Sequence, residues 1–211
     1  MTDQTYPELQ EPIILAEGIS FMDYLVQFEG QHTEWHVGKV VQKVSNNERH
    51  QLVLGFLYRL VMDFLEIKGL GMAYMAGFPM YISPDVPARE PDLMVILNDK
   101  LDKVTATYLD EPADIAVEIV SPGSYNDDRV VKLFEYEKVG VREYWFIDPI
   151  RKDTSIYVLN EDGRYERHPE DDKKRLQSAI LEGFVLLPTV LWQEQLPTRL
   201  EINQLLEAML D

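Results

Sequence analysis

Two short segments that are apolar at almost every position place the strongest constraint on the fold of this 211-residue chain. They run from Pro91 to Leu97 and from Asp114 to Val120. A strand with one face in water alternates apolar and polar residues, whereas a strand covered on both faces is apolar throughout. The two segments therefore predict a central sheet that is packed between two layers.

The second of these segments opens a βαβ unit. An amphipathic helix is predicted over Asp127–Val139, with Val130, Val131 and Phe134 facing inward, and another apolar strand over Glu143–Ile147. Because the connections are short, we expect the two strands to be parallel and joined by a right-handed crossover.

The remaining patterns add helices and strands around this unit. They predict a short helix from Ser20 to near Gly30, an N-terminal β-hairpin over Glu34–Val44, a long helix over Asn47–Lys68, a strand over Gly71–Ser83, a hairpin formed by Thr154–Leu159 and Arg164–Arg167, two short strands, and a C-terminal helix over Arg199–Leu210. We expect an α/β fold in which helices flank a central mixed sheet, with an N-terminal hairpin and additional C-terminal strands. An acidic arm over residues 1–18 would precede a single domain over residues 19–211.

Composition excludes several classes of site and partner. The chain has no cysteine, which excludes disulfides, cysteine zinc sites and thiol nucleophiles. No apolar run is long enough for a membrane helix, and the acidic N-terminus does not read as a secretory signal, so a soluble cytoplasmic protein is expected. The net charge of −17 is uneven: residues 1–38 hold seven acids and no Lys or Arg, whereas residues 126–152 are neutral. The acidity therefore does not exclude a nucleic-acid partner.

A single carboxylate interrupts each of the two apolar strands. Glu118 lies within Ile115–Val120, and Asp92 lies at the head of the strand that ends at Leu97. A charge in a core strand costs several kcal/mol unless it is paired or bound to a metal. If the two carboxylates meet at one end of the sheet, they would bind a hard divalent cation such as Mg²⁺. Two structural alternatives stay open, because Asp92 follows a proline as turn residues do, and Glu118 could emerge into solvent.

Residues across the middle of the chain form a recognisable pattern. They are Pro91-Asp92, Val117-Glu118-Ile119-Val120-Ser121-Pro122, Asp127, Asp128, Lys132, Tyr136, Gly140-Val141, Glu143-Tyr144-Trp145 and Asp148-Pro149, with weaker matches at Glu34 to Gly38 and at His50. This pattern resembles the Uma-type family of restriction-endonuclease-like proteins, long classed as a domain of unknown function within the PD-(D/E)XK nuclease superfamily. The resemblance extends from about Ser20 to the C-terminal helix, and its most specific part runs from Glu118 to Pro149.

The resemblance implies a restriction-endonuclease-like fold and metal-dependent hydrolysis of phosphodiester bonds. Asp92 and Glu118 would be ligands to Mg²⁺, for which Mn²⁺ would substitute. The superfamily's lysine two positions after the second acid is absent, because Val120 stands there. The family's lysine on the following helix matches Lys132, whose ammonium would stabilise charge on the phosphate or position the attacking water. Without the resemblance, Lys132 reads as a surface lysine paired with Asp128 four residues away.

Two further residues are auxiliary candidates. Glu34 would be the fourth acid that the superfamily usually carries, and Glu48 and Glu90 are the next candidates. Glu34 is equally consistent with an exposed hairpin residue. His50 falls on the apolar stripe of the long helix. It is either a hydrogen-bonded core residue or, as the resemblance implies, an auxiliary residue beside the site.

The expected function is that of a Mg²⁺-dependent endonuclease acting on nucleic acid, with DNA favoured over RNA. Because duplex DNA offers two strands to cut, a homodimer is also expected. The alternative is a catalytically impaired nuclease fold with a binding or regulatory role, which Val120 keeps open. A glycosidase, which also needs two carboxylates, is a distant third because no aromatic sugar platform is evident.

Overall fold

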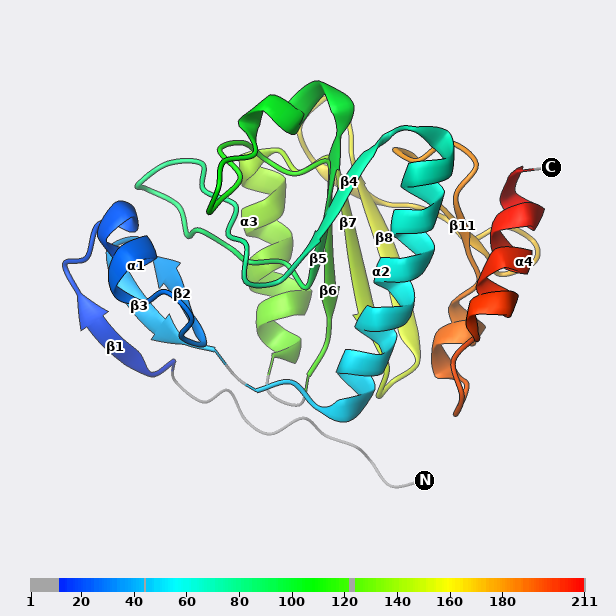
Figure 1. The fold of residues 1–211 in the computed structure, drawn as a ribbon, viewed down its shortest axis with the longest axis horizontal. Helices are drawn as coiled ribbons and strands as arrows, with labels where there is room; N and C mark the ends of the chain where they lie inside the picture. The colour runs from blue at the N-terminus through cyan, green and yellow to red at the C-terminus, as the bar shows by residue number, and fades with distance from the viewer. Residues whose placement is uncertain (1–11, 44, 122–123, 211) are drawn as a thin grey trace.

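A six-stranded mixed sheet forms the centre of the computed structural model, which describes residues 12–43, 45–121 and 124–210 (Figure 1). The strands lie in the order β4-β5-β6-β7-β8-β9, and only β6 and β7 run parallel to each other. The strands are β4 (Gly71–Met75), β5 (Leu93–Leu97), β6 (Ile115–Ile119), β7 (Glu143–Asp148), β8 (Asp153–Leu159) and β9 (Tyr165–Arg167). The predicted α/β class and the parallel pair are confirmed.

Helices cover both faces of this sheet, as the uninterrupted apolar strands predicted (Figure 1). The helices are α1 (Phe21–Gln27), α2 (Glu48–Lys68), α3 (Lys132–Val139) and α4 (Arg199–Leu210). Alternate residues of β6 divide between two apolar cores: Val117 packs with α2 and α4, whereas Ala116 packs with Tyr136 of α3. Strand residues therefore have apolar partners on both sides, which leaves no solvated face.

The long helix α2 begins and ends where its capping residues stand. The Asn47 side chain accepts a hydrogen bond from the backbone N–H of His50, and Gly69 ends the helix in the left-handed conformation with φ 63°. Both are the residue types that such caps favour. The Asn47 cap lies in the first turn, and His50 of that turn contacts Asp92 at the end of the sheet where β5 begins and β6 ends.

A small three-stranded sheet with order β1-β3-β2 precedes the central sheet. It consists of β1 (Ile14–Glu17), β2 (Thr33–His36) and β3 (Lys39–Gln42). The predicted hairpin corresponds to β2 and β3, and Val44 lies outside the described residues. Of the predicted acidic arm, residues 1–11 lie outside the described residues, and β1 pairs with β3. This unit attaches to the segment before β5, since the backbone N–H of Ala88 donates to the carbonyl of Trp35.

The C-terminal segment completes the layer on α2. The short strands β10 (Leu176–Gln177) and β11 (Val185–Leu186) pair, and they are followed by a 3₁₀ turn (Pro188–Trp192) and α4. The buried side chains of Ile202 and Leu206 join the core that α2 forms with the sheet. No helix among the described residues is long and apolar enough to cross a membrane.

Two expectations are wrong in detail. The strand predicted over Gly71–Ser83 ends at Met75, because Gly77 adopts a positive φ of 97° and Pro79 has no N–H to donate to a ladder. In the helix predicted over Asp127–Val139, the three apolar residues that were expected to face inward are exposed instead: Val130, Val131 and Phe134.

The outward position of these apolar residues follows from how α3 begins. The turn before it, Asp127–Val131, is π-helical, and the face directed at the sheet carries Asp128, Lys132 and Tyr136. Such π-helical turns are found frequently at functional sites. Polar contacts with the end of β6, together with the packing of Leu133, Tyr136 and Val139 into the apolar core, therefore determine the orientation of this helix.

Candidate active site

Two carboxylates meet where β5 begins and β6 ends. Leu93 is the register partner of Val117, so Asp92 and Glu118 form the next position along the same pair of strands. Asp92 Oδ2 accepts a hydrogen bond of 2.8 Å from the backbone N–H of Ile119, and both carboxylates are buried. Asp92 is therefore tied to the neighbouring strand rather than capping a turn, and Glu118 does not emerge into solvent.

The side chain of Lys132 reaches Glu118 from the first turn of α3. Its Nζ lies 2.9 Å from Glu118 Oε2 and 2.8 Å from Asp128 Oδ1, and the side chain is 12% exposed. Tyr136, one turn further along, donates a 2.6 Å hydrogen bond to Glu118 Oε1. Lys132 is thus not a surface lysine in a solvated helical pair, although its partner four residues away is the expected Asp128.

The site is short of positive charge. If ionised, the buried carboxylates of Asp92, Glu118 and Asp128 carry three negative charges against the single charge of Lys132. The pKa of Glu118 is raised to about 8: burial raises it most, Lys132 opposes this shift, and the carboxylates of Asp92 and Asp128 raise it. Burial also raises the pKa of Asp128. Glu118 and Asp128 are therefore costly to ionise at this place.

The charge of the lysine itself is secure. Burial alone would lower the pKa of Lys132, but the carboxylates of Asp128 and Glu118 raise it well above its ordinary value. Its Nζ therefore stays an ammonium at neutral pH, able to donate hydrogen bonds and stabilise negative charge but not to accept a proton.

His50 orients the other carboxylate. The imidazole is buried, and its Nε2 lies 2.9 Å from Asp92 Oδ2, the same oxygen that accepts from Ile119. Its Nδ1 is buried and has no hydrogen-bond partner among the described residues. A proton on Nδ1 would therefore be unsatisfied, so the neutral ring carries its proton on Nε2 and donates it to Asp92. His50 thus contacts the site, as the auxiliary role expects.

Glu34 belongs to a second ionic cluster beside the first. Its Oε2 lies 2.8 Å from Arg89 Nη1 and 2.6 Å from His36 Nε2, and its Oε1 accepts from the backbone N–H of Glu90. Burial would raise the pKa of Glu34, but Arg89 and then His36 hold it well below its usual value. It is a buried, ionised residue of β2 and not an exposed hairpin residue, and these partners already occupy both oxygens.

Glu48 and Glu90, the two alternatives to Glu34 as the fourth acid, differ from each other. Glu48 is exposed at the start of α2, whereas Glu90 is buried and pairs with Lys43 at 3.2 Å and with the hydroxyl of Tyr24 at 3.3 Å. Burial would lower the pKa of Lys43, but Glu34 and Glu90 raise it. Lys43 therefore provides a second, partly exposed ammonium at this end of the sheet.

The sequence reading missed Arg89. This residue links the two sides, since it pairs with Glu34 of β2 and at 2.6 Å with Glu135 of α3. Its only sequence signal is its place three residues before Asp92. Tyr136 belongs to the family pattern and stands one helical turn after Lys132, but the sequence assigned it no role in the site.

The donor set fits a hard divalent cation. Asp92 Oδ1 makes no hydrogen bond to the described residues, and carboxylate oxygens are ligands that Mg²⁺ prefers. If a divalent ion bound here, its two positive charges would favour ionisation of Glu118 and Asp128, whose pKa values are raised in its absence. Across the described ranges, no three His, Asp or Glu side chains are arranged to hold a metal ion. An ion at Asp92 and Glu118 would therefore complete its shell with water or substrate oxygens, as Mg²⁺ commonly does.

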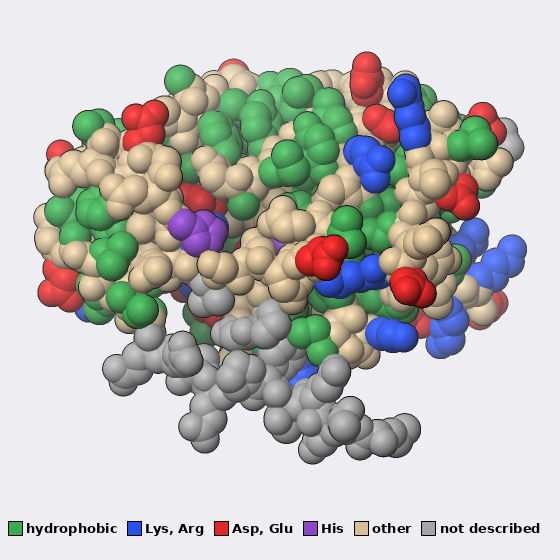
Figure 2. Space-filling view, turned by 60° about the horizontal axis from the view of Figure 1, so that its bottom comes forward, with side chains coloured by type: hydrophobic (Ala, Val, Ile, Leu, Met, Phe, Trp, Pro, Cys, Tyr) green, Lys and Arg blue, Asp and Glu red, His purple; other side chains and the backbone are tan. Residues whose placement is uncertain are grey.

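The surface around this end of the molecule is not uniformly acidic. In Figure 2, red and blue side chains are scattered, most Lys and Arg lie on the right of the view, and hydrophobic side chains gather in its upper middle. This agrees with the burial of the carboxylates of the site. Among the described residues visible in this view, Asp and Glu side chains form no continuous patch.

Comparisons with known proteins agree with this architecture. The Uma2 family, described as "Putative restriction endonuclease", matches residues 20–189. The chain is similar in fold to the crystal structure of a protein from Anabaena variabilis that is titled a putative nuclease, with 17% identity and a TM-score of 0.69 over 82% of this chain and 97% of that one. No curated protein matches the sequence. At 17% identity the structural likeness concerns the fold alone.

Proposed function

Since the chain belongs to the Uma2 family, we propose that it is a Mg²⁺-dependent endonuclease that hydrolyses phosphodiester bonds, with DNA as substrate. One observation carries the proposal: the buried carboxylates of Glu118 and Asp128 share one ammonium, that of Lys132, beside the buried carboxylate of Asp92, where β5 begins and β6 ends. An arrangement that serves stability alone would pair these charges, because an unpaired buried charge costs several kcal/mol. A doubly charged ion and a phosphate would complete it.

Asp92 and Glu118 would hold the metal. His50 fixes one oxygen of Asp92 and leaves Oδ1 available, and Tyr136 fixes one oxygen of Glu118. Such outer hydrogen bonds orient ligands and tune their affinity. When bound, Mg²⁺ would lower the pKa of a coordinated water and offset negative charge on the phosphate.

Lys132 acts as a cation toward the phosphate. Its ammonium lies against Glu118, so a phosphate drawn to the same place would meet it directly. Because the pKa of Lys132 is raised, it would stabilise the additional negative charge of the transition state and would not act as a base. This assigns Lys132 electrostatic stabilisation, in place of the missing lysine at position 120.

The substrate and assembly follow as proposals from the same chemistry. Lys43, which is partly exposed, and Arg89, which is buried, add two further cations at this end, each paired with carboxylates. Sequence-independent phosphate contacts of this kind would position a nucleic-acid backbone. A homodimer would bring two such sites to the two strands of a duplex, and the cytoplasm would be the compartment in which the protein meets DNA.

The test is cleavage of supercoiled plasmid by the purified full chain with 5–10 mM Mg²⁺, a concentration on the order of what weak Mg²⁺ sites need. We expect nicked and linear products that EDTA abolishes and that Glu118→Gln does not form. Cleavage that persists unchanged in EDTA, or in Glu118→Gln, would contradict the proposal.

A binding protein with an impaired site is the second candidate, and one observation favours it. Lys132 is already held by two carboxylates, and Val120 is a buried apolar residue where the superfamily has its lysine. Such a protein would bind DNA with the same affinity in wild-type and Lys132→Met forms and would cleave it in neither.

A further inference from the structure

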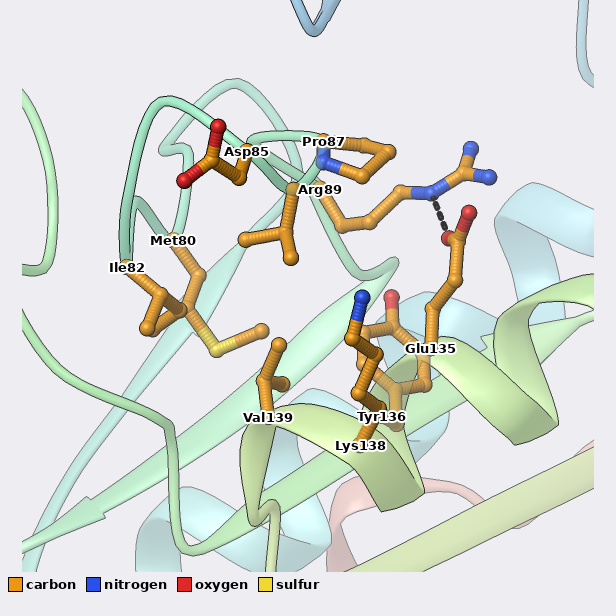
Figure 3. A pocket seen from close by; sticks show the side chains of 10 residues that line it. Met80, Ile82, Asp85, Pro87, Arg89, Glu135, Tyr136, Lys138 and Val139 are labelled. Atoms are coloured by element: carbon orange, nitrogen blue, oxygen red, sulfur yellow. Dashed lines mark hydrogen bonds and ion pairs between the residues drawn. The ribbon is translucent and has the colours of Figure 1, made fainter.

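A small pocket lies behind the candidate site, between α3 and the segment 80–89 that leads to β5 (Figure 3). Its volume is about 100 Å³. Apolar side chains form its walls, among them Met80, Ile82 and Pro87 from the segment and Val139 from α3. It is an apolar recess that opens to solvent on one side, the usual character of a small-molecule site.

The pocket shares two side chains with the candidate active site. The ring of Tyr136 lines it, while its hydroxyl donates to Glu118 Oε1 at 2.6 Å. Arg89 crosses the mouth to Glu135, as Figure 3 shows, and its Nη1 lies 2.8 Å from Glu34. A molecule in the pocket would thus be one side chain away from the carboxylate proposed to hold the metal.

Two charged groups at the pocket have no ionic partner among the described residues. The carboxylate of Asp85 and the ammonium of Lys138 make no ion pair or side-chain hydrogen bond with the described residues. In Figure 3, Lys138 extends from α3 toward the segment that carries Asp85 and Pro87. One donor and one acceptor above apolar walls suit a flat ring with a polar edge.

The volume of the pocket limits a bound molecule to a single ring. A closed cavity of about 150 Å³ holds benzene, so this smaller pocket would take one six-membered ring only in part, with the outer edge of the ring and its sugar at the open mouth. A purine or a base pair would not fit. A base can enter such a pocket only when it is unpaired, as enzymes that extrude bases show.

We propose that this pocket binds one unpaired pyrimidine base of the nucleic-acid substrate, next to the phosphate at Lys132. This rests on the proposed function and deepens it, because the protein would then cut beside a single-stranded or extruded nucleotide. Pro87 and Val139, from the two walls, contact the faces of the ring, and Asp85 and Lys138 bind its edge.

The first test uses mononucleotides with the metal-free full chain, so that binding is measured without cleavage. Calorimetry compares dTMP, dAMP and 2-deoxyribose 5-phosphate. We expect dTMP to bind about 10-fold more tightly than the sugar phosphate, the lower end of what stacking of one base provides, and dAMP to show no such advantage. Equal affinities for dTMP and the sugar phosphate would overturn the proposal, as would an equal advantage for dAMP.

The second test fills the pocket. Val139→Phe should remove the advantage of dTMP, whereas Val130→Phe, at an exposed position one turn before the same helix, should keep it. Retention in Val139→Phe would overturn the proposal. If thermal unfolding shows that Val139→Phe does not fold, Ile82→Phe replaces it.

Plasmid cleavage measured in parallel separates the two proposals. Mg²⁺-dependent cleavage without a preference for dTMP over the sugar phosphate overturns the base pocket and leaves the nuclease. A preference for dTMP without cleavage overturns the nuclease and supports the pocket.

Discussion

The strand β6 has a buried carboxylate near each end, and the two have opposite surroundings. Asp114, just before the strand, accepts a hydrogen bond from the backbone N–H of Leu97 and pairs with both Arg142 at 3.1 Å and Lys100 at 3.2 Å. Glu118, at the other end, shares the single ammonium of Lys132 with a second carboxylate. Asp114 therefore pairs with two cations, whereas Glu118 competes with Asp128 for one.

This difference separates a structural carboxylate from a candidate functional one. Burial alone does not distinguish them, since Asp114 is as buried as Glu118. The pairing of charges does: Asp114 has two cationic partners, whereas Glu118 and Asp128 share the one ammonium of Lys132. Functional sites are where such perturbed groups gather.

The largest expected effect comes from removing the cation at the Glu118 end. Lys132→Met should lower the rate of Mg²⁺-dependent plasmid cleavage by about 10²–10³-fold, the usual loss for one stabilising group of this kind. Initial rates at saturating Mg²⁺ measure it. The matched variant at the other end, Arg142→Met, should cut within about threefold of wild type; equal losses in both variants would break the comparison.

A second prediction concerns the ionic cluster beside the site. Glu34→Gln should lower the free energy of unfolding at pH 7 by about 3 kcal/mol, because it breaks a buried pair with Arg89. The folded-state pKa of Glu34 lies below its usual 4.5. Its contribution is therefore present above pH 4.5 and is lost as the pH falls through the lower, folded-state pKa.

Urea unfolding at pH 7 and near pH 3 measures this dependence. The difference between wild type and Glu34→Gln should shrink on acidification. A difference that stays constant would mean that Glu34 contributes through packing and not through its charge.

A third prediction contrasts the two ends of β6 in stability. Asp114→Asn should destabilise the metal-free protein by about 2 kcal/mol, since it leaves the partly buried Lys100 without its counter-charge. Glu118→Gln should cost less than about 1 kcal/mol, because it relieves crowding among carboxylates. Thermal unfolding in EDTA compares them, and a larger loss in Glu118→Gln would contradict the account.

The smallest effect is expected from His50. His50→Leu keeps an apolar volume but removes the donor to Asp92, so Mg²⁺ affinity should fall about 10-fold. Metal titration followed by calorimetry measures this change. Unchanged affinity would make His50 a core residue without a positioning role.

The sequence predicted the elements that hydrophobic patterns determine. The covered sheet, the parallel pair and the two acids that interrupt it were accessible because a charge in an apolar strand stands out. The orientation of α3 could not be predicted in this way, since Val130 and Phe134 were expected to be buried in the core. Their outward position depends on contacts of Asp128 and Lys132 with a different strand, which no local pattern records.

Arg89 was missed for the same physical reason. Its three acidic partners come from β2 and from the region of α3, far apart in the sequence. Periodicity reports which face of an element is buried, but not which charges meet across elements. The family resemblance supplied Lys132, which helical spacing alone would have left as a surface residue.

The most direct test is calorimetric titration of the metal-free protein with Mn²⁺, which stands in for Mg²⁺. We predict one ion per chain, a loss of affinity of at least about 100-fold in Asp92→Asn and in Glu118→Gln, and unchanged binding in Asp114→Asn. No binding to the wild type at millimolar Mn²⁺, or wild-type affinity in Asp92→Asn and Glu118→Gln, would contradict the claim that the Glu118 end of β6 is a cation site.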